Sequence, residues 1–366
     1  MNKSLPKSSF PAIRKWFMYT LFAFILLLLK INYIFAQETI DVGVTGWYVK
    51  RPVLASACPH GCPWGELGEF VQEAMEPMDY EVILCRNCNY NLGPRIVATK
   101  SYPPELNEDM IRSGTTQRVN ATIDFGITSS LQLTNAYNGG VDNPEEDHFS
   151  NLRLIAHIED PSYLLVGVKK ATGITDLSQI KEKRLPVTVI SRGGEVENAV
   201  LNYYGLTQEA LESWGGSLGR VGEENLEFDV IIGGNASPSQ NPECSYWTEY
   251  SYKYDLYFLD LAEELLEQID KNVTGYEPAF VKWGLLRGVD RAIPTVARSG
   301  QAIFARDDIP EQAAYDIAKT IDIHQSGLKW YIRIYTYDSQ TVWKNDDVPL
   351  HPGAERYYRE KGYIPH

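Results

Sequence analysis

Glycine-rich polar segments that follow short apolar runs are the parts of this sequence best suited to hold a ligand. The sharpest is Ser191-Arg192-Gly193-Gly194-Glu195, between the apolar run 185–190 and a helical pattern over 195–204. Glycines let a ligand approach the main chain, and the free N–H groups at a helix N-terminus favour an anion. The Arg192 guanidinium would add a bidentate bond to a carboxylate. An ordinary turn with a surface arginine is the alternative interpretation.

Three other loops have the same character. They are Thr45-Gly46-Trp47-Tyr48 after 40–44, Thr128-Ser129-Ser130 after 122–128, and Gly233-Gly234-Asn235 after 228–232. In an open α/β sheet, ligands bind at the edge formed by the carboxyl ends of the strands. Trp47 and Tyr48 would wall a pocket at that edge, or they are simply core residues. Taken together, the four loops predict ligand-binding residues that converge on one cleft.

The motifs that mark several large enzyme classes are missing. The sequence has no Walker A loop, no H-E-x-x-H pair and no G-x-G-x-x-G dinucleotide loop. Its six histidines are scattered, and no two of them have the spacing of metal ligands on one helix. These observations favour a binding protein over an enzyme, with no catalytic residue, cofactor or metal site expected.

The charge of the chain is distributed unevenly. The 366 residues contain 34 Lys and Arg against 48 Asp and Glu, which gives a net charge of −14. The first 36 residues carry five basic residues and no carboxylate, so the other 330 residues have a net charge of −19. A body this acidic is unsuited to nucleic acid, because phosphate contacts need clustered Lys and Arg. The length exceeds what one hydrophobic core comfortably fills, which predicts two domains.

The basic N-terminal segment has the pattern of a secretory signal peptide. Arg14-Lys15 precedes the uninterrupted apolar run Trp16–Leu29, and Ala36 supplies a small residue for cleavage. The alternative is an uncleaved membrane anchor. Spanning a bilayer takes about 20 apolar residues, a length this segment reaches only by including Lys30 and Asn32. We therefore expect residues 1–36 to be a signal peptide and the body to be periplasmic.

Four of the five cysteines lie close together, as Cys58 and Cys62 in CPHGC and Cys85 and Cys88 in CRNC. In an oxidising compartment, two disulfides within this cluster are the simplest outcome, and three pairings are open. A zinc site and a redox pair are the alternatives. The C-x3-C spacing is looser than that of structural zinc sites, and the asparagines around CRNC indicate a turn-rich loop.

The body alternates strand and helix patterns, which is typical of α/β lobes. Helices are expected over 195–204, after a capping box at Asp308–Glu311, and after Pro352 with Glu355 and Arg359 paired. Strands are expected at the short apolar runs, namely 40–44, 80–85, 122–128, 152–158, 164–168, 185–190 and 228–232. No low-complexity linker interrupts them, so the lobes should be joined by crossing strands.

At this point the sequence resembles the TAXI-type solute-binding proteins of TRAP transporters, the tripartite ATP-independent periplasmic transporters. The similar stretches are NLRLIAHIEDPSYLLVGV, GITDLSQIKEKRLPV and the ending VPLHPGAERYYREKGY. DFGI at 124–127, FDVIIGG at 228–234 and DDIPEQAAYDIAK near Asp307 fit as well, and the resemblance covers most of 37–366.

The resemblance implies a bilobed type II periplasmic-binding-protein-like fold, with two α/β lobes around a ligand cleft. The expected lobes are 37–160 plus 296–366 and 161–295. It also implies a small carboxylate ligand, such as a glutamate-like amino acid or a 2-oxo acid, handed to TRAP permease subunits that an ion gradient drives. The ligand loops would be Thr45–Tyr48, Thr128–Ser130 and Ser191–Glu195.

Some segments depart from the family pattern. The first loop, TGWYVKRPVLASACPHGCPWGELGE, is longer than the family's usual G-G-x-G-T-Y-Y and carries two cysteines, and an aromatic run occupies 246–257. A bulkier, aromatic carboxylate would suit such loops. A receptor that feeds a membrane sensor is the first alternative function, and an exported thiol or metal enzyme is the second.

Overall fold

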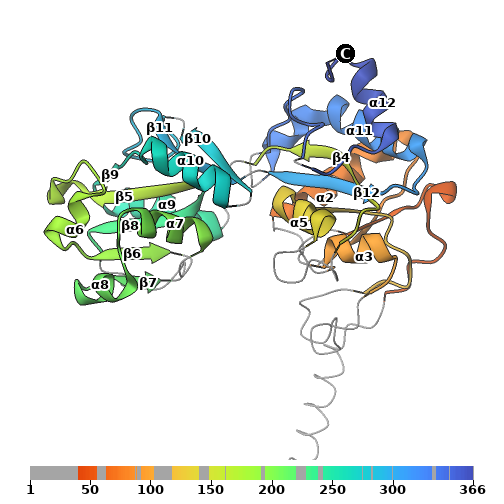
Figure 1. Ribbon diagram of the computed structural model, residues 1–366. Coiled ribbons are helices and arrows are strands. Elements are labelled where there is room, and N and C mark those ends of the chain that lie inside the picture. The colour runs from red at the N-terminus through yellow and green to blue at the C-terminus, as the bar shows by residue number, and fades with distance from the viewer. Residues whose placement is uncertain are drawn as a thin grey trace, which may run out of the picture.

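The computed structural model describes residues 40–55, 63–86, 88, 92–102, 118–139, 148–160, 162–190, 194–219, 228–237, 242–273, 275–281, 283–298, 300–331, 335–345 and 347–365. These residues form two α/β lobes that lie side by side (Figure 1). Each lobe has its own sheet and its own buried hydrophobic clusters, and no cluster contains residues of both. The expected bilobed α/β fold is confirmed.

The first lobe is built on a five-stranded sheet with the order β2-β1-β3-β12-β4. Strands β1, β2 and β3 are parallel, and β12 runs antiparallel to both β3 and β4. Helices α2, α11 and α12 cover one face, and α3 and α5 cover the other. The bounds are β1 Val53–Ala55, α2 Pro63–Met75, β2 Ile83–Cys85, α3 Gly93–Thr99, β3 Phe125–Ser129, α5 Ser130–Asn138, β4 Leu152–Ile158, β12 Gln301–Arg306, α11 Glu311–His324 and α12 Pro352–Glu360.

The second lobe has a seven-stranded sheet with the order β10-β11-β5-β8-β6-β7, and β9 pairs with β5. Helices α6, α7, α8 and α10 contribute to the hydrophobic cluster on one face, and α9 contributes to the other. The bounds are β5 Ser162–Lys169, α6 Gln179–Lys183, β6 Val187–Ile190, α7 Glu195–Tyr203, α8 Gln208–Ser213, β7 Ser217–Gly219, β8 Val230–Ala236, α9 Pro242–Lys253, β9 Leu256–Phe258, α10 Glu263–Asn272, β10 Tyr276–Val281 and β11 Ile293–Arg298. Short 3-10 helices occur at Trp47–Val49, Glu76–Met78, Lys170–Thr172 and Gln325–Trp330.

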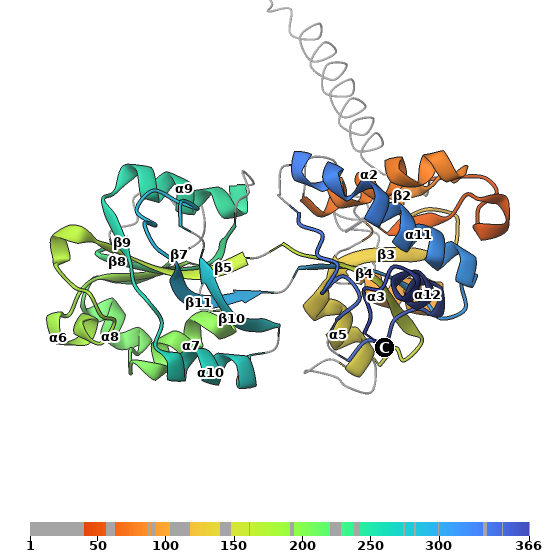
Figure 2. The same cartoon turned by 90° about the horizontal axis from the view of Figure 1, so that it is seen from above.

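Two short segments connect the sheets, between β4 and β5 and between β11 and β12, as seen from above in Figure 2. They pass so close together that a Cβ at Gly300 would lie 2.0 Å from the Ile158 carbonyl oxygen. Only glycine fits at that position, because a side chain would overlap the neighbouring main chain. The expected lobe boundary at 296 falls inside β11, which pairs with β10 and β5 of the second sheet.

Most strands form where the sequence predicts them, but the run 40–44 does not. Ile40 makes only an isolated bridge to Val119, and the first strand of the sheet is Val53–Ala55 instead. Gly43 and Gly46 have positive φ angles, and the Arg51 guanidinium donates hydrogen bonds to the Val42 and Val44 carbonyl oxygens. These carbonyls are therefore engaged by a side chain rather than by a neighbouring strand.

The expected capping box at Asp308–Glu311 is also absent. Pro310 is the N-cap of α11 and no side chain caps it, whereas Asp308 pairs with Lys100 and with Arg306. The helix after Pro352 is confirmed as α12, with an ion pair between Glu355 and Arg359.

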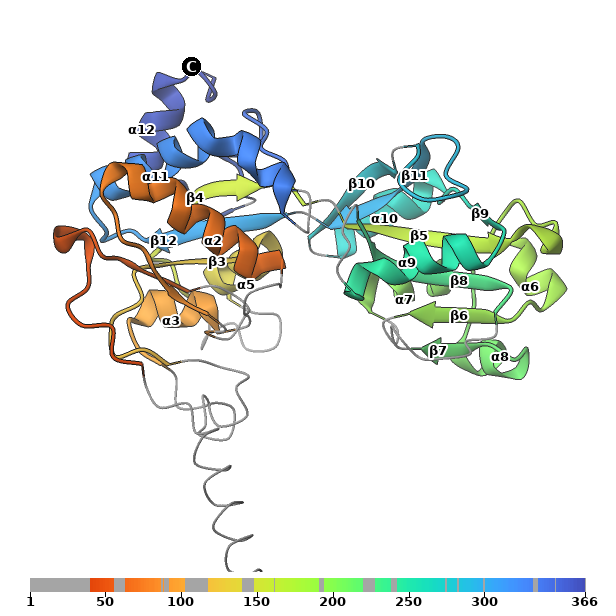
Figure 3. The same ribbon diagram turned by 180° about the vertical axis from the view of Figure 1, so that it is seen from behind.

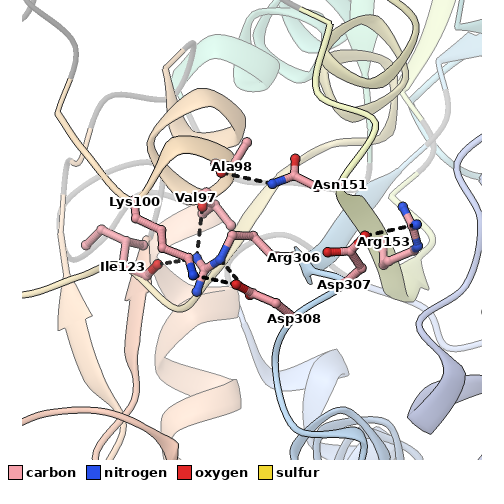
Figure 4. Close-up of polar contacts among 9 residues, drawn as sticks. All are labelled: Val97, Ala98, Lys100, Ile123, Asn151, Arg153, Arg306, Asp307 and Asp308. Carbon is pink, nitrogen blue, oxygen red and sulfur yellow. Dashed lines mark hydrogen bonds and ion pairs between the residues drawn. The ribbon is translucent and has the colours of Figure 1, made fainter.

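A buried arginine ties the outer end of the first sheet together, as Figure 4 shows. The Arg306 side chain is only 5% exposed. Its guanidinium donates to the carbonyl oxygens of Val97 and Ile123, each at 2.8 Å, and pairs with Asp308 at 2.9 Å. Burial opposes ionisation of Asp308, but its contacts with Lys100 and Arg306 outweigh this and lower its pKa. A buried cation is tolerated here because all of these acceptors point at it.

We predict that Arg306→Leu lowers the free energy of unfolding by about 2–5 kcal/mol, because it leaves two buried carbonyl oxygens without their donor and removes the partner of the half-exposed Asp308 carboxylate. Urea unfolding followed by circular dichroism measures this. The control is Arg359→Leu, which removes an exposed pair on α12 and should cost about 0.5 kcal/mol. Equal losses in the two variants would contradict the assigned role of Arg306.

His351 caps α12 from a buried position. Its Nδ1 accepts a hydrogen bond from the Gly353 N–H at 3.2 Å, and the residue is fully buried. Burial lowers the pKa of His351, because the imidazolium ion would lose its hydration. The folded protein therefore holds this histidine neutral.

This lowered pKa predicts a loss of stability in acid. The unfolded chain takes up a proton at His351 below about pH 6.5 while the folded chain resists it, so stability is complete above that pH and falls below it. His351→Asn keeps an acceptor at the N-cap and should flatten the decline between about pH 7 and pH 5. Thermal unfolding across that range tests this, with the exposed His324→Asn as the control. A slope unchanged by His351→Asn would refute the assignment.

Candidate functional site

The carboxyl edges of both sheets face the two connections between the lobes. In the first sheet, β4 ends and β12 begins at the edge where β3 ends, because Gln301 pairs with both Ser129 and Ile158. In the second sheet, β8 ends opposite the start of β5, since Ala236 pairs with Tyr163, and β6 runs parallel to β8. Ligands bind at this edge in open α/β sheets, so the region around the connections is the candidate site.

The segment Thr128–Ser130 lies on the first of these edges, as the sequence predicts. Ser129 is the N-cap of α5, and its hydroxyl accepts a hydrogen bond from the Gln132 N–H at 3.2 Å. The Thr128 hydroxyl donates to Gln132 Oε1 at 2.7 Å. The local cause is the change from an extended strand to a helix at Ser129, where a hydroxyl side chain satisfies a first-turn N–H. Both hydroxyls are therefore already hydrogen-bonded within the protein.

Three buried polar atoms beside the connections have no hydrogen-bond partner among the residues that the structure describes. They are Ser130 Oγ, Gln301 Oε1 and Ser237 Oγ, and each of these residues is more than nine-tenths buried. Ser237 directly follows β8, and Gln301 opens β12. Leaving such a group unsatisfied costs about 1–3 kcal/mol. Two opposing edges thus carry polar groups that a polar ligand would satisfy.

The second lobe supplies the N-terminus of α7 to this edge. Gly194 is its N-cap, and no side chain caps the first turn in the described structure. The helix follows β6 as the sequence predicts, and Glu195 is its first residue. Ser191, Arg192 and Gly193 lie outside the described residues, so the Arg192 prediction stays a prediction. First-turn N–H groups of this kind favour an anion.

Arg298 is a candidate that the sequence reasoning missed. It ends β11, where it pairs with Ser162 of β5 and with Tyr276 of β10. It is half-buried and makes no hydrogen bond or ion pair with the residues that the structure describes. Burial raises the pKa of Tyr276, and Arg298 and the α7 glutamates Glu195 and Glu197 lie close enough to act on it as well. A half-buried guanidinium therefore lies at the end of β11, beside Tyr276 and next to the connection between the lobes.

Little in the sequence could have singled out Arg298. It is the last residue of a strand that the sequence reasoning did not expect. The residues beside it come from segments that are distant in the chain. The available sequence signal is weak: Arg298 stands two residues before Gly300.

The segment Thr45–Tyr48 lies at the other end of the first sheet and does not join the site. It precedes β1 instead of following it, and the Trp47 ring packs 5.5 Å from the ring of Phe125, the first residue of β3. Trp47 also contacts Tyr80, whereas Tyr48 is 99% exposed. The prediction that Thr45, Gly46, Trp47 and Tyr48 converge with the other loops fails because the run 40–44 is not the first strand.

The glycines of β8 are used for internal packing. The Gly234 carbonyl oxygen accepts hydrogen bonds from Tyr246 Oη at 2.5 Å and Trp247 Nε1 at 2.9 Å, and its N–H donates to Glu197. Asn235 lies in the strand rather than in a loop after it. The aromatic run on α9 therefore holds a strand in place, and Gly234 has no main-chain group left for a ligand.

One further segment, Gly215–Gly219, has the G-x-S-x-G spacing of a hydrolase nucleophile elbow. That motif needs its serine on a sharp turn between a strand and a helix. Ser217 instead begins β7, and its hydroxyl is hydrogen-bonded to that of Thr188 at 3.2 Å. The segment therefore has the spacing of the motif without the strand–turn–helix geometry that the motif needs.

Cys85 and Cys88 are bonded to each other as a disulfide. Both are buried, and the Tyr102 hydroxyl contacts Cys85 Sγ at 3.6 Å. Cys58 and Cys62 lie outside the described residues. Within the described parts of the chain, no group of three His, Cys, Asp or Glu side chains is placed to hold a metal ion. The described half of the cysteine cluster is thus a buried, bonded pair.

We predict one free thiol per chain when the protein is unfolded without a reductant. The sequence predicts two disulfides within the cluster, and the bond between Cys85 and Cys88 then leaves Cys58 and Cys62 to form the other. Titration with a thiol reagent counts the free groups, and elemental analysis of the folded protein measures zinc. Five titratable thiols, or stoichiometric zinc, would contradict a disulfide cluster.

Residues 115–362 match the model of the NMT1-like family, which is more than half of the chain. The protein belongs to the NMT1-like family. Among solved structures, it is similar to a TctC solute binding protein from Polaromonas, with 12% identity, a TM-score of 0.40, and coverage of 87% of this chain and 100% of that one. It is also similar to Rpa4515 of R. palustris with adipate, with 10% identity, a TM-score of 0.40, and coverage of 87% and 97%.

A third similar structure is MatC of Rhodopseudomonas palustris with bound malate, with 11% identity, a TM-score of 0.37, and coverage of 85% and 97%. Similarity this remote carries no information about the ligand of this NMT1-like protein. No helix in the described part of the chain is both long and apolar enough to cross a membrane.

Proposed function

We propose that this NMT1-like protein is an exported solute receptor that captures a small carboxylate or amino-acid-like solute between its lobes. The observation that carries the proposal is the composition of the two facing edges. They hold three buried polar atoms without a partner among the described residues, the uncapped N-terminus of α7, and the half-buried Arg298. Groups of these kinds are suited to bind a polar, anionic ligand.

Each group has a role that its chemistry suggests. The Arg298 guanidinium would form a bidentate bond with a carboxylate, and the first-turn N–H groups of α7 would bind the same group or a second one. Ser130 and Gln301 would bind polar groups of the solute from the first lobe. The exposed Glu195 side chain, at the start of α7, would pair with the ammonium group of an amino acid.

The capture of an anion by a body with a net charge of −19 requires a local source of positive potential. Arg298, Arg192 and the helix N-terminus would supply it. The same reasoning predicts that binding weakens as salt screens these groups, since the exposed part of the attraction falls with ionic strength.

The further parts of the proposal rest on the leader and on the family resemblance in the sequence. Residues 1–36 would export the protein to the periplasm, and the loaded receptor would deliver its solute to the membrane permease of a TRAP transporter. The protein itself would catalyse no reaction and carry no cofactor.

A screen of L-glutamate, 2-oxoglutarate and aromatic 2-oxo acids by thermal unfolding tests the central claim. A ligand that binds only the folded state adds about 2.7 kcal/mol of stability at 100 times its Kd, which raises the melting temperature by several degrees. No stabilisation by any carboxylate or amino acid, in a protein shown to be folded, would count against the proposed function.

With a ligand identified, we predict that Arg298→Ala weakens binding by about 30-fold or more, because it removes one partner of a desolvated ion pair. Arg298→Lys should recover part of the affinity, since it restores the charge without the bidentate geometry. Arg192→Ala should also weaken binding. Isothermal titration calorimetry measures each affinity, and Arg287→Ala, on an exposed loop of the same lobe, is the matched control. Unchanged affinity in both Arg298→Ala and Arg192→Ala would overturn the site.

A further inference from the structure

A cavity of about 460 Å³ opens on the first lobe, and all of its lining residues belong to that lobe. It lies between α2 and the 3-10 helix Gln325–Trp330 that follows α11. Figure 3 shows α2 and α11 running side by side on this face. Cavities of this size are typical of small-molecule sites. All of its lining residues are described, and they are Phe70, Glu73, Ala74, His324, Ser326, Gly327, Trp330 and Tyr331.

The walls of this cavity are aromatic. The Phe70 and Tyr331 rings lie 6.0 Å apart in an edge-to-face arrangement, and Phe70 is anchored in the core of the lobe. Trp330 contributes a third ring and is 81% exposed. An indole this exposed adds nothing to the core, because its apolar surface remains in water. Gly327 lies directly against Phe70, since a Cβ there would lie 3.4 Å from the Phe70 ring.

The wall of the cavity contains a carboxylate. Glu73 lines it, and this carboxylate makes no hydrogen bond or ion pair with the described residues. Burial and, to a smaller extent, the carboxylates of Glu73, Glu69 and Glu66 together raise the pKa of Tyr331 to about 12. Three carboxylates of α2 therefore act on the ring of Tyr331. Of these, Glu69 is neutralised by Arg86 at 2.5 Å.

The Trp330 ring already attracts an ammonium group. The Lys329 Nζ lies 5.5 Å from the centroid of this ring, in the position of a cation–π contact. Lysine at 329 is on a flexible, exposed stem and is the neighbour of Trp330 in sequence. A single exposed contact of this type is weak. A free cation at sufficient concentration can therefore replace the Lys329 ammonium group on the ring.

We propose that this cavity is a second ligand site, which binds a small alkylammonium compound. Aromatic faces attract a cation through their quadrupoles, and methylated ammonium groups, which are weakly hydrated, suit such walls best. Glu73 supplies the compensating charge. The site belongs to one lobe, so it requires neither closure of the two lobes nor the proposed carboxylate site.

Titration of the purified protein with tetramethylammonium chloride, followed by the line width of its methyl NMR resonance, tests the proposal. We expect saturable binding, weakened about three- to thirtyfold by Trp330→Ala and about two- to fivefold by Glu73→Gln. Trp330→Phe keeps an aromatic ring and should retain most of the affinity. The matched control is Trp283→Ala, which removes a tryptophan that is 77% exposed on the other lobe and should leave binding unchanged.

Neutral tert-butanol, which has a similar shape, separates attraction of a cation from a merely apolar cavity. Binding of tert-butanol as tight as that of tetramethylammonium would overturn the proposal. So would an absence of saturation by the wild-type protein, or an equal loss in Trp283→Ala and Trp330→Ala. Should Trp330→Ala fail to fold, the Glu73→Gln and Trp330→Phe arms still decide the outcome.

Discussion

The close approach of the two connections between the lobes is the constraint on which the rest of the structure depends. At Gly300 the second connection passes so near the end of β4 that even a methyl group would overlap the Ile158 carbonyl oxygen. The main chains are thus in contact at the point where the chain passes between the sheets. β4 ends and β12 begins at this point. The edge of the first sheet at which β3 and β4 end therefore faces the second lobe. The same geometry holds for β5, β8 and β11 on the other side.

This constraint explains why polar residues gather where they do. Strand ends and helix starts leave main-chain groups unpaired, and the Ser129 hydroxyl accepts a hydrogen bond from one of them, the Gln132 N–H of α5, while the Thr128 hydroxyl donates to the Gln132 side chain. Ser130, Gln301 and Ser237 remain without a partner among the described residues, although each is buried. Natural proteins seldom leave such groups without a partner, so each of these three is a candidate for contact with a polar ligand. The Arg306 cluster at the opposite end shows the contrast, since every donor noted there has an acceptor.

The predictions made from local pattern succeeded where the determinants are local. The strands at 152–158 and 187–190 and the helices beginning at Glu195 and Pro352 follow from apolar runs, helical periodicity and proline at a first turn. The failures share a cause. The run 40–44 alternates like a strand, but the side chain of Arg51, which lies beyond the run, engages its carbonyls. Asp308 has the position of a cap but pairs with Lys100 and Arg306. In both cases, a partner elsewhere in the sequence competed with the local preference.

The sequence by itself determined the two-lobed α/β class, the polar strand end at Thr128–Ser130 and the helix start at Gly194, because hydrophobic spacing and turn residues act over a few positions. Only the tertiary structure decided which of these ends meet. It placed Trp47 against Phe125 at the wrong end of the sheet for a ligand, and it brought Arg298 beside Ser162 and Tyr276. Such placements depend on strand order and register, which are set by contacts between segments far apart in the chain and leave no mark on the local pattern.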